Sequence, residues 1–278
     1  MMVYLSTFEF AQSEKHACPH RFLESKGIGK LYFNPITIFY GSNGSGKSTA
    51  LNVIARAIGV QKMSLGNENE FFQNYLKECS YEMVAKPRDI SFIRSEDIME
   101  GIAAIRRRNE EIFESVQNKS ESLDEYGIDD LSQRFTDPDS GNYKDRYMLS
   151  RIKWAQILSS ELYSRQEYYS NGETAMKYFN IRLMANSLFF LDEPENSMDA
   201  PYQHKLAVML ESLSRKSDCQ FIIATHSPFL LSIENALIID LDSFPVRDRK
   251  WYQLSNMRYY YRFFNLFSSL FEYEENTH

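Results

Sequence analysis

The sequence predicts an α/β fold in which a mixed sheet carries a phosphate-binding loop and is interrupted by an inserted helical lobe. Ile36–Tyr40 has the composition of a strand and runs directly into a glycine-rich segment, after which apolar residues continue from Leu51 at helical spacing. Leu188–Leu191 and Phe221–Thr225 are short apolar runs typical of buried strands. Between these parts, residues 62–165 are charged, rich in turn signals and expected to be mainly helical.

The remaining elements complete this assignment. Loose alternation predicts an antiparallel strand region near the N-terminus, and helical periodicity predicts two helices in the second half. The expected elements are strands at Val3–Phe10, Lys30–Phe33 and Ala236–Leu241, an amphipathic helix at Pro201–Ser214 and an aromatic helix at Asn256–Glu272. The α/β core therefore takes residues 1–61 and 166–278, and the lobe takes residues 62–165 of the same domain.

Composition limits the class of protein. The chain has 278 residues, of which 31 are basic and 38 acidic, giving a net charge of −7 that offers no support for nucleic-acid binding and does not exclude it. Three cysteines (Cys18, Cys79 and Cys219) without CxxC spacing predict reduced thiols. No leader is visible, and the longest uncharged aromatic run, Phe263–Phe271, is too short to cross a bilayer. We expect a cytoplasmic protein that does not insert into membranes.

The strongest motif is the P-loop (Walker A) pattern Gly41-x4-Gly46-Lys47-Ser48. Its glycines allow successive backbone N–H groups to surround phosphate oxygens at the start of a helix. We expect Lys47 to contact the β- and γ-phosphates of ATP and the Ser48 hydroxyl to bind Mg²⁺. The nucleotide-binding residues are predicted to be Gly41, Ser42, Asn43, Gly44, Ser45, Gly46, Lys47, Ser48 and Thr49.

Two further segments supply candidate catalytic groups. Leu188–Leu191 ends in Asp192 and Glu193, as expected of a Walker B strand in which Asp192 holds the magnesium shell and Glu193 deprotonates the attacking water. His226 follows another buried strand at the edge where open α/β sheets place their sites, and it is expected to sense the γ-phosphate. Either segment standing alone would be compatible with a purely structural role.

The segment Tyr169–Glu173 has two interpretations, and local sequence does not decide between them. Ser170 and Glu173 have the spacing of a capping box, and an apolar stripe at helical spacing follows. Ser170 with the bare backbone of Gly172 at a helix N-terminus is equally a candidate anion site.

The order of these motifs resembles the ATPase head shared by ABC transporters, RecF, SMC proteins and small stand-alone bacterial ATPases of the ABC class in the AAA family. The resemblance implies that Ser170, Asn171 and Gly172 form a signature that completes the γ-phosphate site of a second subunit. It also implies that Asn196–Asp199 form a D-loop at the dimer interface and that His226 is the switch histidine. The glutamine of the family's Q-loop is missing near Phe92–Glu96, and Glu96 is expected to replace it near the metal, unless it is only a solvated carboxylate at a helix start.

The same resemblance implies Mg²⁺-dependent ATP hydrolysis by a head-to-tail homodimer that forms with ATP. Tyr-Ser-Asn-Gly-Glu in place of a transporter signature, and Glu195-Asn196-Ser197 after Asp-Glu-Pro, favour a stand-alone ATPase that governs a separate protein effector. Genome maintenance and anti-phage defence are the roles expected by analogy. The alternatives are a nucleotide-binding subunit of an ABC transporter and a regulatory clamp that gates a nuclease or toxin.

Three other features give weaker signals. His16, Cys18 and His20 are close together, but their spacing is not that of a zinc site. Arg106–Arg108 is followed at once by two glutamates, which favours a solvated helix face over a phosphate contact. The aromatic C-terminal helix either packs on its own core, the favoured prediction, or docks a partner.

Overall fold

The computed structural model describes residues 1–11, 26–60, 70–101, 103–104, 107, 171–196 and 198–275. Contacts divide the chain into two units, one made of Met1–Met99 with Asn171–His278 and one of Glu100–Ser170. Nearly all of the second unit lies outside the described residues, so the architecture below is that of the first. No helix in the described part of the chain is long and apolar enough to cross a membrane.

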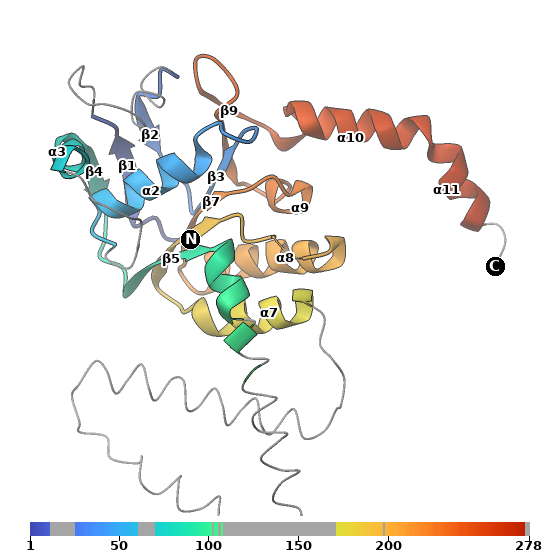
Figure 1. The fold of residues 1–278 in the computed structure, drawn as a ribbon, viewed down its shortest axis with the longest axis horizontal. Coiled ribbons are helices and arrows are strands. Elements are labelled where there is room, and N and C mark those ends of the chain that lie inside the picture. The colour runs from blue at the N-terminus through green and yellow to red at the C-terminus, as the bar shows by residue number, and fades with distance from the viewer. Residues whose placement is uncertain are drawn as a thin grey trace, which may run out of the picture. The chain divides into compact units, whose positions relative to one another are not determined.

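The larger sheet has six strands in the order β5-β6-β7-β3-β8-β9 (Figure 1). Five strands run parallel and β9 pairs antiparallel to β8 at one edge. The strands are β3 (Ile36–Tyr40), β5 (Asp89–Arg94), β6 (Ser187–Asp192), β7 (Gln220–Ala224), β8 (Leu237–Asp240) and β9 (Arg247–Arg249). Every residue of β3 and β7 is buried, which explains why both are continuous apolar runs in the sequence. The predicted α/β fold with a mixed, mostly parallel sheet is confirmed.

A second, smaller sheet is antiparallel and is formed by strands from the N-terminal part of the chain. It contains β1 (Leu5–Glu9) between β2 (Lys30–Tyr32) and β4 (Ser80–Met83). The buried Gln220 amide joins the two sheets, since its oxygen accepts from the N–H groups of Tyr4 and Leu5 at 2.8 and 2.9 Å and its nitrogen donates to Leu5 O. A buried amide with these partners avoids the cost of an unsatisfied polar group and fixes the register between the sheets.

Helices cover the main sheet. α2 (Lys47–Ala57) follows the P-loop and contacts β6 and β7, while α7 (Asn171–Arg182) packs against α8 (Ala200–Lys216). α3 (Glu70–Glu78) contacts α2, and the short α9 (Pro228–Leu231) contacts α8. α8 begins where its sequence predicts, because the Asp199 carboxylate accepts the Tyr202 N–H and a proline occupies the first turn.

The start of the predicted lobe at residue 62 is wrong. Residues 70–94 form α3, β4 and β5, and both strands belong to the core sheets. They were not recognised because β4 and β5 are edge strands whose side chains are mostly exposed or half-buried, so they lack the apolar run of a central strand. The rest of the lobe lies outside the described residues and stays a prediction.

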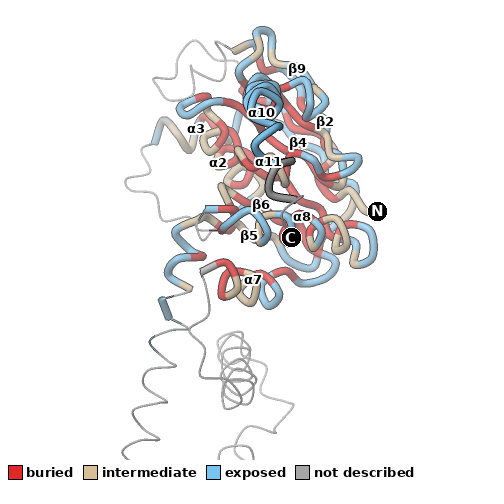
Figure 2. Tube along the Cα trace, turned by 90° about the vertical axis from the view of Figure 1, so that its right-hand side faces the viewer, coloured by how far each residue is buried: buried red, intermediate tan, exposed pale blue. Residues whose placement is uncertain are grey.

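The C-terminal end of the chain differs from the favoured prediction. The single turn η1 (Trp251–Gln253) leads into α10 (Ser255–Leu266) and α11 (Ser268–Glu275), which we call the C-terminal arm. Between residues 255 and 271 only Met257 is buried, and Figure 2 shows α10 in the colour of exposed residues. The arm therefore does not pack on its own core. Its first turn is held by the Tyr40 hydroxyl, 3.5 Å from Ser255 Oγ and 3.4 Å from the Asn256 N–H nitrogen.

Candidate functional site

The P-loop connects the buried strand β3 to α2 and has the backbone of an anion-binding loop. Gly44 and Gly46 have φ values of 77° and 96°, which other residues rarely adopt. Gly46 caps α2 without a side-chain hydrogen bond, and no acidic residue lies in the first turn. The N–H groups of that turn, together with the positive end of the helix dipole, suit a phosphate group.

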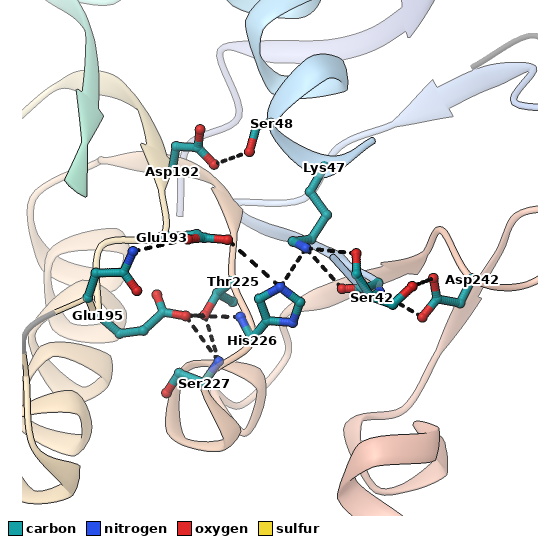
Figure 3. A network of polar contacts seen from close by, with 12 residues as sticks. Ser42, Lys47, Ser48, Asp192, Glu193, Glu195, Thr225, His226, Ser227 and Asp242 are labelled. Carbon is teal, nitrogen blue, oxygen red and sulfur yellow. Dashed lines mark hydrogen bonds and ion pairs between the residues drawn. The ribbon is translucent and has the colours of Figure 1, made fainter. Parts of the chain in front are cut away.

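Asp242, just after β8, fixes the start of the P-loop and was not predicted. Its carboxylate accepts from the Ser42 N–H at 2.7 Å and from the Ser42 hydroxyl at 2.9 Å (Figure 3). A Cβ on Gly41 would lie 2.4 Å from Ser45 Oγ and 3.2 Å from Asp242 Oδ1. Glycine is thus required at position 41 because the loop folds tightly against these two side chains.

Lys47 is buried in the centre of the site. Its ammonium donates to Gly41 O at 2.9 Å, to Ser42 O at 3.3 Å and to His226 Nε2 at 2.6 Å. Burial lowers the pKa of Lys47 and the nearby carboxylates, Glu193 first, oppose that shift. Burial, followed by the charge of Lys47, also lowers the pKa of His226, which favours the neutral ring. Since an ammonium can only donate, Nε2 accepts and the ring proton is assigned to Nδ1.

Ser48 and Asp192 meet at the carboxyl end of β6. The Ser48 hydroxyl donates to Asp192 Oδ1 at 2.9 Å. The pKa of Asp192 is raised chiefly by burial and further by Glu193, while the Ser48 hydrogen bond and the charge of Arg94 act in the opposite direction. A hydroxyl and a carboxylate side by side are ligands of the kind that Mg²⁺ prefers.

Glu193 turns away from β6 in a left-handed conformation, with φ of 47°. Its N–H is held by Ala224 O at 2.9 Å, and its Oε2 accepts from the Asn196 amide at 3.0 Å. Its Oε1 lies 3.8 Å from His226 Nε2. A non-glycine residue held at positive φ is a feature often found at functional sites, and here it directs a carboxylate toward the P-loop side of the sheet edge (Figure 3).

Glu195 positions His226 and was not assigned a role from the sequence. Its Oε1 accepts from the Thr225 hydroxyl, from the His226 N–H at 2.9 Å and from the Ser227 N–H at 3.1 Å. Only 7% of Glu195 is exposed, and burial raises the pKa of its carboxyl. One buried oxygen therefore holds the whole turn after β7 in place.

A second unpredicted group is the pair Arg94 and Asn52. Arg94 ends β5 in register with Asp192 of β6, and its guanidinium donates to Asn52 Oδ1 at 3.1 Å. The Asn52 amide in turn donates to Ser48 O at 2.7 Å. The sequence signal was present, since Arg94 lies within Phe92–Glu96, the segment in which the family's glutamine is missing, but the strand pairing is needed to choose it over Glu96.

The structure describes some of the other predicted residues, and others lie outside the described part of the chain. Glu96 is exposed in the helical segment that follows β5, and its charge contributes to the raised pKa of Asp192. Asn171 begins α7, and Gly172 is buried so tightly that a Cβ would lie 2.5 Å from Tyr202 Cδ2. Ser170 lies outside the described residues, as do Ser197, His16, Cys18, His20, Arg106 and Arg108. Among the residues that are described, no group of three or more His, Cys, Asp or Glu could hold a metal ion.

Comparison with known proteins adds a partial family match. The family model described as "AAA domain, putative AbiEii toxin, Type IV TA system" matches residues 159–232, which include Asp192, Glu193 and His226. No curated protein matches the chain. Together with the P-loop, this match over part of the chain supports a nucleotide-binding site of the AAA/ABC type. The site is a P-loop site.

Two solved structures are similar over most of this ATPase-type chain. One is a chain of an inward-facing ABC transporter assigned to the metal-chelate type, with 13% identity, a TM-score of 0.44, and coverage of 92% of this chain and 87% of that one. The other is an SMC head domain from Pyrococcus furiosus bound to the C-terminal domain of ScpA, with 14% identity, a TM-score of 0.42, and coverage of 93% and 99%. Because both TM-scores are low, the fold is assigned from the strand order and the P-loop alone.

Proposed function

We propose that this chain binds ATP with Mg²⁺ and hydrolyses it to ADP and phosphate. The observation that carries the proposal is the convergence of three separate segments on one sheet edge: Lys47 and Ser48 after β3, Asp192 and Glu193 at the end of β6, and His226 after β7. The residues fit a nucleotide, because the first turn of α2 offers N–H, ammonium and hydroxyl donors on one side and carboxylates lie opposite them. Bound Mg²⁺ would supply the positive charge that offsets the charge of the phosphates.

Each side chain has a distinct task in this proposal. Lys47 releases His226 and binds phosphate oxygens, while Ser48 and Asp192 hold the metal. Glu193, kept in place by Asn196, accepts the proton of the attacking water. Once Lys47 no longer donates to Nε2, the neutral ring of His226 is free to carry its proton on Nε2 and to donate toward the new phosphate, while Glu195 still holds its backbone. Glu96 is proposed as an additional carboxylate near the metal, acting from the helical segment after β5.

We further propose that ATP joins two copies head-to-tail, so that Ser170, Asn171 and Gly172 of one copy meet the γ-phosphate bound by the other. The motif order and the place of Gly172 in the first turn of α7 support this arrangement. The cycle would control a separate protein effector, and the matching family, whose name refers to a type IV toxin–antitoxin system, supports a toxin–antitoxin setting. Nothing in the site itself favours a transporter subunit.

The decisive experiment is the solution mass of Glu193→Gln with and without Mg-ATP. The substituted amide keeps the shape of the side chain but cannot take the proton, so hydrolysis should fall by about 10²–10⁴-fold while ATP binding persists. We expect ATP to double the mass of this variant, and Ser170→Arg added to it to abolish the doubling.

Two controls make the result interpretable. Lys47→Ala should bind no ATP and give the same mass under all conditions. If Glu193→Gln hydrolyses ATP as fast as the wild type, Glu193 is not the base. If its mass ignores ATP although ATP binds, the head-to-tail dimer is wrong.

A further inference from the structure

The C-terminal arm exposes an apolar surface that a chain in water does not leave uncovered. Its exposed apolar side chains are Tyr259, Tyr260, Tyr261, Phe263, Phe264, Leu266, Phe267, Leu270 and Phe271. On α10 they cover more than half of the circumference, whereas a helix that packs on one surface needs an apolar stripe of about 100°. The arm is therefore built to be enclosed from more than one side.

The area of this surface is that of a specific protein interface. Seven of its aromatic side chains, those whose burial the structure describes, are exposed by 39–69%. Since a Tyr or Phe side chain presents about 150–250 Å², these seven alone expose on the order of 700 Å². A stable interface buries about 800 Å² on each partner, and the largest patch on an ordinary monomer is about 300–600 Å².

Aromatic contacts hold the two helices of the arm in one arrangement. The rings of Phe263 and Phe267 are 5.1 Å apart, and those of Phe264 and Phe271 are 6.1 Å apart across the break between α10 and α11. A surface that is already ordered loses less conformational entropy when it binds, which favours association.

The charges of the arm indicate its occupant. α10 carries Arg258 and Arg262 and no acidic residue, whereas α11 carries Glu272, Glu274 and Glu275 and no basic residue. Two arms laid antiparallel would place the basic helix of each along the acidic helix of the other. A surface that is complementary to itself in this way is what a two-fold interface between identical chains requires. An anionic membrane would attract α10 but repel α11.

We propose that the C-terminal arm is a homotypic docking surface that pairs antiparallel with the arm of a second copy of this chain. Aromatic side chains form the centre of the contact, and the arginine–glutamate pairs set its direction. This contact needs no nucleotide, so the mass test of the ATP-driven dimer proposed above is made in a chain that also carries Arg258→Glu/Arg262→Glu, in which the arms do not pair and the two proposals can fail separately.

The test is the mass of the full-length protein without nucleotide, measured by sedimentation equilibrium. The 32.6 kDa chain should dimerise. Arg258→Glu/Arg262→Glu should raise the dissociation constant at least tenfold, as should Glu272→Arg/Glu274→Arg/Glu275→Arg. Mixing these two variants should restore association as a heterodimer. Lys86→Glu/Lys216→Glu makes the same change in net charge at exposed lysines outside the arm and should leave the dimer intact.

Three outcomes would overturn the proposal. The wild type could be monomeric at all accessible concentrations, or the mixed charge variants could fail to associate while their circular dichroism matches the wild type. A wild type that is monomeric in solution but sediments with phosphatidylserine vesicles would identify a membrane as the occupant instead.

Discussion

Arg94 occupies a position where one positive charge influences two candidate metal ligands. It opposes the rise in the pKa of Asp192 through its charge, and it reaches Ser48 through Asn52. We regard it as a positioning residue, because it acts on the metal site through its neighbours.

Arg94→Ala should therefore weaken the Mg²⁺-dependent part of ATP binding. Groups that orient metal ligands typically contribute about 10–100-fold to metal affinity, and we expect a loss in that range. Titration of fluorescent ATP with and without EDTA separates the two parts, since binding without the metal should change little. Arg94→Lys keeps the charge and loses the planar donor to Asn52, so it should recover part of the affinity. Equal losses with and without Mg²⁺ would contradict this role.

His226 gives a prediction on pH. Burial and the charge of Lys47 lower its pKa in the folded state below the ordinary value of about 6.5. The folded chain therefore binds this proton less readily than the unfolded chain, and the stabilisation involved is present above pH ~6.5 and lost as pH falls through the folded-state pKa. The unfolding free energy of wild type minus that of His226→Gln should be larger at pH 8 than at pH 5 in urea titrations. A difference that does not change with pH would show that the pKa of the ring is not lowered in the folded state.

At the scale of elements, the contact between α7 and α8 explains a glycine that the sequence left ambiguous. A Cβ at Gly172 would approach Tyr202 Cγ to 2.7 Å and Tyr202 Cβ to 3.0 Å, so rotation of the tyrosine ring cannot relieve the overlap. Gly172 is thus needed for helix packing, whatever it does for nucleotide binding.

Gly172→Ala should destabilise the fold by about 1–3 kcal/mol, as is usual for overpacking. Tyr202→Ala in the same chain should remove most of that loss, giving a coupling energy in a double-mutant cycle. Chemical denaturation of the four proteins measures it. If Gly172→Ala retains full stability and loses only ATP-dependent association, the glycine serves the nucleotide alone.

The elements also show what could be predicted from the sequence. Central strands such as β3, β6 and β7 are mostly apolar because both faces are buried, and the P-loop and both catalytic segments follow such strands directly. Edge strands β4 and β5 are mostly exposed or half-buried and therefore lack this apolar signal. The contacts of Asp242 with Ser42 and of Arg94 with Asn52 join residues 200 and 42 positions apart, so only the sheet order brings them together.

For the molecule as a whole, the described residues offer two different surfaces through which copies of the chain are proposed to associate. One is the nucleotide site on the carboxyl edge of the main sheet, where the proposed partner contributes through α7. The other is the C-terminal arm, whose exposed aromatic surface does not involve that edge. Two independent contacts of this sort allow a chain to form closed pairs through one and longer assemblies through both.

Tyr40 connects the start of the C-terminal arm to the start of the P-loop. The Tyr40 hydroxyl contacts Ser255 and Asn256, and Tyr40 is bonded directly to Gly41, the first residue of the P-loop. Any coupling through this contact would be reciprocal, so arm pairing would alter ATP affinity by the same factor by which ATP alters arm pairing. Arm pairing depends on the concentration of the protein. Through such coupling, the concentration of the chain would influence its own affinity for ATP. A cell could then set the threshold of this ATPase simply by how much of it is made.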